Sequence, residues 1–188
     1  MALSFENNFE VPLPICDAWH VLLDVPRIAK CLPGAELTET VDARTYKGKV
    51  NVRVGPVALT FAGVATIEEI DEANRCVRVT GAGAEAKGRG RASAEFRIRL
   101  EDAGNGATRV IANSDVTLSG SVAQYGRGVG IMKAVADEII ARFAKNLEQE
   151  IAGGGIAAAG DAPSVSAAGV LWGAGKRMFK KDEELDSQ

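Results

Sequence analysis

The chain has 188 residues, 46% of them hydrophobic, and a formal net charge of −3 at pH 7. This length and apolar content suffice for one folded domain with an appended segment, and they exclude a wholly disordered chain. A slightly acidic protein has no overall attraction for nucleic acid, so any anionic partner must be met by a local basic patch.

Cysteine and histidine, the residues most used in metal and nucleophilic sites, are few. The three cysteines, Cys16, Cys31 and Cys76, lie far apart and form no CxxC pair, which disfavours a disulfide framework or a zinc site and fits a reducing compartment. His20 is the single histidine, so a metal site with two histidine ligands is excluded. We expect no metal and no catalytic residue.

The N-terminal residues, MALSFENNFEV, have no basic stretch followed by an apolar run, so no signal peptide is expected. No uncharged apolar run approaches the roughly 18 residues that cross a bilayer. These two features predict a cytoplasmic protein.

The first elements are a strand and two short helices. Residues 3–11 alternate between apolar and polar side chains, which predicts a strand that ends at Pro12. In the following segment, PICDAWHVLLDVP, apolar residues recur at helical spacing, and this helix should end at or before Pro26. A second short helix is expected from Arg27 to Cys31.

From residue 35 to 119 the apolar period is two, with breaks at 42–43, 55–56, 71–74, 87–88 and 105–106, which predicts about six antiparallel strands. After Gly120 the period becomes helical, with an apolar stripe of Met132, Val135, Ile139, Phe143 and Leu147. This order predicts an α+β fold in which a curved antiparallel sheet wraps the last helix. An unrelated α+β sandwich is the alternative.

The segment GRGRASAEFRIRLE, residues 88–101, has two distinct faces. One face carries arginines from Arg89 to Arg99 with interspersed glutamates, and we interpret it as a solvated face because no aromatic residues interleave for base stacking. The other face carries small side chains at its start and large ones at its end, and neighbouring strands share this pattern. Glycine inside strands marks a close approach, either of the protein's own long helix or of an apolar ligand.

The C-terminal part divides into three segments. Residues 152–164, AGGGIAAAGDAPS, are too small and glycine-rich to pack, which predicts a flexible linker. Residues 165–181 should form an amphipathic basic helix that lies in the interface of an anionic membrane. Its membrane-binding residues are Leu171, Trp172, Lys176, Arg177, Met178, Phe179, Lys180 and Lys181. Residues 182–188 are acidic, so packing of the helix on its own domain or on a partner protein is the alternative.

Two stretches, DVPRIAKCLPGAEL at 24–37 and SGSVAQYGRGVG at 119–130, resemble the carbon monoxide dehydrogenase G-subunit family. This family lies within the helix-grip superfamily of START-like and pollen-allergen-like lipid carriers and polyketide cyclases. The most specific part of the resemblance is Cys31, Leu32, Pro33, Gly34 and Ala35. The resemblance implies a helix-grip domain over residues 1–151, with a seven-stranded sheet gripping the last helix around an apolar cavity.

The same resemblance implies an accessory role beside a molybdenum hydroxylase that passes electrons to the respiratory chain, on the cytoplasmic face of the membrane. Three functions are compatible with it: a carrier of a quinone or other apolar lipid, a membrane adaptor without ligand, and a polyketide-cyclase-like enzyme. In the carrier, the cavity would be lined by Phe61, Gly81, Gly83, Gly90, Ala92 and Tyr125. Bulky replacements of Gly90 or Ala92 would then cost little stability. Cys31 fits better as a small buried residue before a tight turn than as a reactive thiol.

Overall fold

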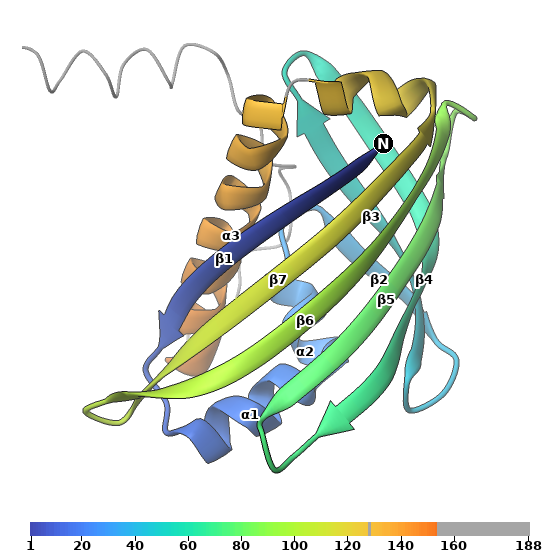
Figure 1. Ribbon diagram of the computed structural model, residues 1–188. Helices are drawn as coiled ribbons and strands as arrows, with labels where there is room; N and C mark the ends of the chain where they lie inside the picture. The colour runs from blue at the N-terminus through green and yellow to red at the C-terminus, as the bar shows by residue number, and fades with distance from the viewer. Residues whose placement is uncertain (128, 154–188) are drawn as a thin grey trace, which may run out of the picture.

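A computed structural model describes residues 1–127 and 129–153 of the chain (Figure 1). The linker from residue 154 on, the amphipathic segment and the acidic tail of the sequence analysis lie outside the described residues. The elements are, in chain order, β1 (Ala2–Val11), α1 (Ile15–Leu23), α2 (Val25–Cys31), β2 (Ala35–Thr40), β3 (Thr45–Val54), β4 (Val57–Asp71), β5 (Cys76–Glu85), β6 (Gly90–Gly104), β7 (Ala107–Gly120), the 3₁₀ helix η1 (Ser121–Arg127) and α3 (Val129–Ile151).

The strands form one antiparallel seven-stranded sheet in the order β1-β7-β6-β5-β4-β3-β2. Strands β2 to β7 follow one another as a meander, and β1 joins at the β7 edge. Figure 1 shows the sheet curving around α3, which packs chiefly against β1 with a smaller contact to β3. The predicted α+β, helix-grip architecture is confirmed.

Helix α2 begins two residues earlier than the sequence analysis predicted. Pro26 ends α1, as expected, but it also occupies the first turn of α2, where its missing N–H is not needed. The Asp24 carboxylate caps this helix by accepting a hydrogen bond from the Arg27 amide at 3.1 Å. Pro26 and the Asp24 cap therefore mark the start of α2 as well as the end of α1.

The helix η1 was not predicted. It lies between β7 and α3, and its first residues are held by the carbonyl oxygen of Arg89, which accepts from Val122 N at 3.0 Å and Ser121 Oγ at 2.8 Å. This carbonyl lies more than thirty residues earlier in the chain. Periodicity cannot reveal an element whose first turn depends on such a distant acceptor.

Strand alternation gives the sheet a concave apolar face with two clusters of buried side chains. The first cluster surrounds Trp19, at the end where α1 and α2 lie, and includes Ile67 and Val77 of the sheet and Leu147 of α3. The second cluster lies at the η1 end and consists of Leu3, Val54, Leu59, Leu118 and Val122. We call these the α1-end cluster and the η1-end cluster.

The Cys-Leu-Pro-Gly-Ala segment joins α2, β3 and α3. Cys31 is fully buried, and its carbonyl oxygen accepts from Asn146 Nδ2 of α3 at 2.9 Å. The carbonyl oxygen of Gly34 accepts from the Asn51 amide of β3 at 2.8 Å. Burial raises the pKa of the Cys31 thiol, so it stays protonated near neutral pH. The segment acts as a structural joint.

No helix within residues 1–127 and 129–153 combines the length and the apolar character needed to cross a membrane.

We predict that Gly34→Ala lowers the free energy of unfolding by roughly 2–4 kcal/mol, because left-handed strain and a steric clash add together. Gly34 has a φ of +78°, and a Cβ there would collide with the carbonyl oxygen of Asn51. Gly55 is the matched control, since its φ is +59° but a Cβ would meet nothing within 4 Å. Gly55→Ala should cost only about 1 kcal/mol. Urea-induced unfolding measures both, and equal losses would contradict the proposed joint.

Candidate functional site

The most unusual surface of the concave face is a patch of small residues on the three central strands. Cross-strand pairing places Gly63 opposite Gly83 and Gly83 opposite Ala92, and one row further Ala65 opposite Gly81 and Gly81 opposite Ala94. All of these residues are half-buried. We call Gly63, Ala65, Gly81, Gly83, Ala92 and Ala94 the small-residue patch.

The patch lies between the two apolar clusters, since Ile67 and Val77 flank it toward the α1 end and Leu59 and Phe61 toward the η1 end. The atoms nearest to a Cβ built at Gly63, Gly81 or Gly83 belong to β4 and β5 and not to α3. Of the two explanations that the sequence left open, close packing of the long helix on the small residues therefore does not account for the patch.

Part of the patch has a different cause, which is the close approach of β4 and β5. A Cβ at Gly63 would collide with the carbonyl oxygen of Ala82, and a Cβ at Gly83 would lie 3.0 Å from the carbonyl oxygen of Ala62. Gly81 differs, because the nearest atom to its Cβ would be Val64 O at 3.9 Å. Gly81 is thus the patch glycine at which a Cβ would fit without a clash.

The structure contradicts the expectation for Gly90. Its φ is +145°, and a Cβ would collide with the carbonyl oxygen of Ser119 and lie 2.8 Å from Val122 Cγ2. The expectation that Gly90 tolerates a bulky replacement is therefore wrong. The glycine is needed where the start of β6 meets the end of β7 and η1.

The aromatic residues predicted to line the cavity come together at one end of the patch. Phe61 on β4 and Tyr125 on η1 are both half-buried, and both pack with Ala92 against the η1-end cluster. Gly81 and Gly83 continue from there along β5. The predicted lining residues thus share one concave surface, with Gly90 at its border for backbone reasons.

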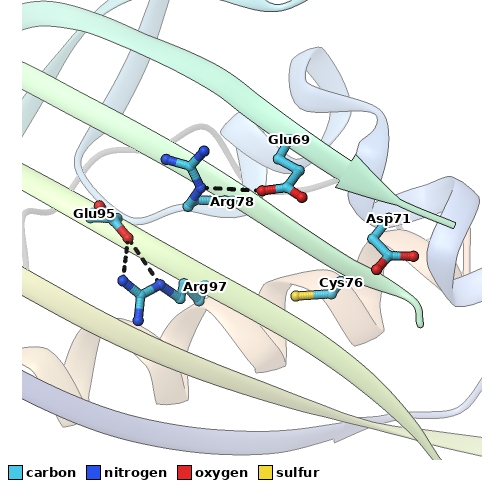
Figure 2. Close-up of a pocket in the computed structure, with 6 residues that line it drawn as sticks. All are labelled: Glu69, Asp71, Cys76, Arg78, Glu95 and Arg97. Atoms are coloured by element: carbon cyan, nitrogen blue, oxygen red, sulfur yellow. Dashed lines mark hydrogen bonds and ion pairs between the residues drawn. The ribbon is translucent and has the colours of Figure 1, made fainter. Parts of the chain in front are cut away.

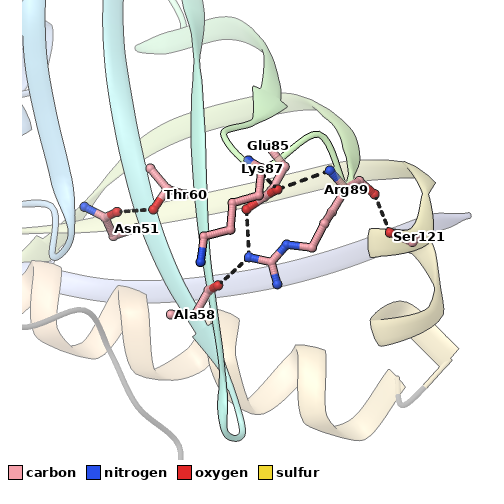
Figure 3. A network of polar contacts seen from close by, with 7 residues as sticks. All are labelled: Asn51, Ala58, Thr60, Glu85, Lys87, Arg89 and Ser121. Atoms are coloured by element: carbon pink, nitrogen blue, oxygen red, sulfur yellow. Dashed lines mark hydrogen bonds and ion pairs between the residues drawn. The ribbon is translucent and has the colours of Figure 1, made fainter.

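A buried ion pair at the same end was missed by the sequence analysis. Glu85, 3% exposed, lies at the end of β5 opposite Phe61. Its Oε1 accepts from Arg89 Nη2 at 2.9 Å, and its Oε2 accepts from the backbone amides of Lys87 and Arg89 at 2.9 and 3.2 Å. Arg89 Nη2 also donates to the carbonyl oxygen of Ala58 at 2.9 Å (Figure 3).

Arg89 had been assigned to the solvated face of the 88–101 segment, and this is wrong. Strand β6 begins only at Gly90, whose positive φ interrupts the alternation before it, so the Arg89 side chain turns toward Glu85. Glu85 could have been found, since it follows Gly81 and Gly83 at period two and must share their concave face. A carboxylate on a buried face signals a partner.

The electrostatics of the pair follow from these contacts. Hydrogen bonds from the Arg89 side chain and the neighbouring backbone amides lower the pKa of Glu85 to about 2, so it is ionised near neutral pH. The pKa of Arg89 is raised, first by Glu85 and then by Tyr125. Arg89 Nε is buried and has no hydrogen-bond acceptor among the described residues.

The convex face is charged, as predicted for the solvated side. A shallow hollow of about 420 Å³ lies there, and Figure 2 shows the six side chains that line it: Glu69, Asp71, Cys76, Arg78, Glu95 and Arg97. Arg97 pairs with Glu95 at 2.7 Å and Arg78 with Glu69 at 3.5 Å. Its polar lining and its location opposite the apolar face distinguish this hollow from the predicted ligand cavity.

The remaining candidate residues are the possible metal ligands, His20 and the predicted membrane-binding residues. In the described part of the chain, no three His, Cys, Asp or Glu side chains lie close enough together to hold a metal ion. His20 is exposed on α1. The membrane-binding residues predicted between 165 and 181 lie outside the described residues.

The Glu85–Arg89 pair predicts a specific acid sensitivity. Because the pKa of Glu85 is about 2 in the folded protein and ordinarily 4.5, its contribution to stability is complete above pH 4.5 and is lost as the pH falls toward 2. The stability curves of wild type and Glu85→Gln should therefore converge over this range in urea unfolding. Glu101→Gln, in an exposed ion pair with Arg99, is the control and should stay parallel to wild type. Parallel curves for Glu85→Gln would contradict the assignment.

Comparison with solved structures identifies proteins of the same fold. A conserved protein from Geobacillus kaustophilus is similar with a TM-score of 0.70 and 22% identity, covering 80% of this chain and 96% of that one. The Zhui aromatase/cyclase from Streptomyces sp. R1128 has a TM-score of 0.53 and 17% identity, over 83% and 100% of the two chains. Truncated norcoclaurine synthase from Thalictrum flavum has a TM-score of 0.55 and 16% identity, over 80% and 94%.

At these identities the similarity establishes the helix-grip fold and not an activity. A comparison with curated protein sequences gives no match. The sequence model of the carbon monoxide dehydrogenase G-subunit (CoxG), however, matches residues 8–152, which includes the Cys-Leu-Pro-Gly-Ala joint, the small-residue patch and η1. The chain therefore belongs to the carbon monoxide dehydrogenase G-subunit (CoxG) family.

Proposed function

We propose that this protein is a non-catalytic accessory protein of a molybdenum hydroxylase of the carbon monoxide dehydrogenase type. In this proposal it binds a lipophilic ligand, a quinone, against the concave face and links the dehydrogenase to the respiratory chain at the membrane. The family membership supports the partner, because the family is named for a subunit of that dehydrogenase.

The observation that supports ligand binding is the half-buried small-residue patch between two apolar clusters. Half-buried apolar surface on the inside of a curved sheet is costly in water and favours an apolar occupant. Phe61 and Tyr125 at one end supply flat surfaces for stacking against a ring. A quinone combines such a ring with an apolar tail.

The adaptor function without ligand remains the second candidate. It is favoured by Gly63, where the backbone of β5 accounts for the missing side chain without any ligand. Gly81 distinguishes the two functions. No neighbouring backbone atom requires a glycine at this position, so the adaptor function leaves it unexplained, whereas the carrier function explains it by a ligand.

A cyclase-like enzyme is the weaker alternative. Such an enzyme needs a polar group in its pocket, and the Glu85–Arg89 pair is one on the inner face. A general base works best with a pKa near the operating pH, however, and a pKa of about 2 makes Glu85 a poor proton acceptor at neutral pH. The pair is therefore better suited to holding a ligand than to proton transfer.

The first test of the carrier is chemical. We expect organic extraction of protein purified from its native host, followed by mass spectrometry, to recover a quinone at close to one equivalent per chain. An empty protein, or a random mixture of lipids, would favour the adaptor.

Gly81→Leu should lower the recovered quinone at least tenfold while changing the unfolding free energy by less than about 1 kcal/mol, because a Cβ there meets only Val64 O at 3.9 Å and the rest of the side chain would extend over the half-buried patch. Ala82→Leu is the matched control, since Ala82 is the next residue and faces the exposed convex side. Equal quinone content in both variants would contradict binding at the patch. A loss of several kcal/mol for Gly81→Leu would mean that protein already fills this space.

Membrane contact is proposed for residues 165–181, on their sequence alone. Basic residues near an anionic leaflet contribute about 1 kcal/mol each, and Trp172 and Phe179 would add apolar burial, enough for exchangeable binding. The protein would then be cytoplasmic and peripherally attached. The acidic residues at 182–188 oppose anionic lipid and favour the alternative of protein contact.

Liposome flotation tests the membrane contact. The full chain should float with vesicles containing anionic lipid, and both a chain ending at Gly155 and the double variant Trp172→Ser, Phe179→Ser should remain in the bottom fraction. Flotation of the truncated chain to the same extent as the full chain would show that residues 165–181 are not the anchor.

A further inference from the structure

We propose that Arg89, neutralised by Glu85, is the polar anchor of the ligand site and selects apolar ligands that carry a neutral carbonyl oxygen. The inference rests on the proposed ligand-binding function. It adds which end of the ligand is recognised, by which atoms, and which class of lipid is rejected.

The location of the pair is the first argument. Glu85 lies two residues beyond Gly83 on the same face of β5 and opposite Phe61, so the pair borders the small-residue patch directly. Leu59, Phe61 and Val122 make this end apolar, and Tyr125 lies close enough to Arg89 to affect its titration. A polar group in such surroundings fixes the orientation of an otherwise apolar ligand.

Unused hydrogen-bonding capacity is the second argument. A guanidinium has five N–H donors, and the two side-chain hydrogen bonds from Arg89 to Glu85 and Ala58 both start from Nη2 (Figure 3). Its Nε is buried with no acceptor among residues 1–127 and 129–153, and buried donors are rarely left unpaired. The side chain as a whole is still 28% exposed, so part of it borders space that a ligand can enter.

Charge balance is the third argument, and it defines the ligand class. Glu85 is 1% exposed at its side chain and forms hydrogen bonds with Arg89 and two backbone amides, so the pair carries no net charge. An anionic ligand would place a second negative charge beside a buried carboxylate, which is unfavourable. A neutral carbonyl oxygen accepts from Arg89 without this cost. The site should therefore prefer a quinone to a fatty acid.

Isothermal titration calorimetry of the full chain with three probes of equal chain length tests this preference. The probes are hexyl-1,4-benzoquinone, hexylbenzene, which has no oxygen, and 4-hexylbenzoate, which is anionic. Because a hydrogen bond to a charged group is strong, the quinone should bind about 10- to 100-fold more tightly than hexylbenzene. The benzoate should bind no more tightly than hexylbenzene.

Two variants then distinguish the effect of the Glu85 charge from the effect of the Arg89 N–H donors. Glu85→Gln keeps an oxygen acceptor for Arg89 but removes the balancing charge, so the benzoate should gain at least about tenfold in affinity. The double variant Glu85→Gln, Arg89→Gln should lose the quinone advantage. Arg91→Gln, on an exposed position of the same strand, is the control and should behave as wild type.

The outcomes distinguish the two proposals. Equal wild-type affinity for quinone and hexylbenzene, or tighter binding of the benzoate, would overturn the anchor and leave the apolar ligand site intact. An unchanged benzoate affinity in Glu85→Gln would also overturn it. Binding of none of the probes would overturn the carrier function and the anchor together. The wild-type comparison needs no variant to fold.

Discussion

The close approach of neighbouring strand backbones at glycine is the constraint on which the rest of this structure depends. At Gly63 and Gly90 the neighbouring carbonyl oxygens of Ala82 and Ser119 occupy the space that a Cβ would need. Larger residues at these positions would force β4 from β5 and β6 from β7. Gly63 belongs to the small-residue patch and Gly90 lies at its border, so the close approach of the strands accounts for part of the open patch.

The Glu85–Arg89 pair extends this constraint to the helical part of the molecule. The Arg89 side chain joins β4 and β5 through Ala58 and Glu85, while its backbone carbonyl oxygen holds the first turn of η1. Helix η1 carries Tyr125 and leads into α3. Arg89 therefore links the strands that border the patch to the helix that carries Tyr125. Partial burial of this charge is tolerated because the Glu85 carboxylate and the carbonyl oxygen of Ala58 both accept from Nη2 of the guanidinium.

The sequence predicts the fold well because each strand has one buried face. Alternation from residue 35 to 119 and the helical stripe after residue 120 specify element type. The five predicted breaks coincide with the turns between observed strands, except that Asp71 is still the last residue of β4. The site is harder to predict. Helix η1 and the orientation of Arg89 both depend on contacts between segments distant in sequence. Gly63, Gly81 and Gly90 also look alike in sequence, although backbone approach explains Gly63 and Gly90 and does not explain Gly81.

The pKa of Glu85 bears on whether the protein carries a ligand or catalyses a reaction. A catalytic site commonly shifts the pKa of an acid or base toward neutral pH, and it usually places that group where water is excluded. Here the buried carboxylate is shifted the other way, to a pKa of about 2, and the adjoining apolar surface is only half-buried. A permanently ionised, internally neutralised pair beside an accessible apolar surface can orient a ligand and release it unchanged. Such properties suit the proposed carrier function better than catalysis, because taking up and releasing a ligand needs neither a proton nor a covalent bond.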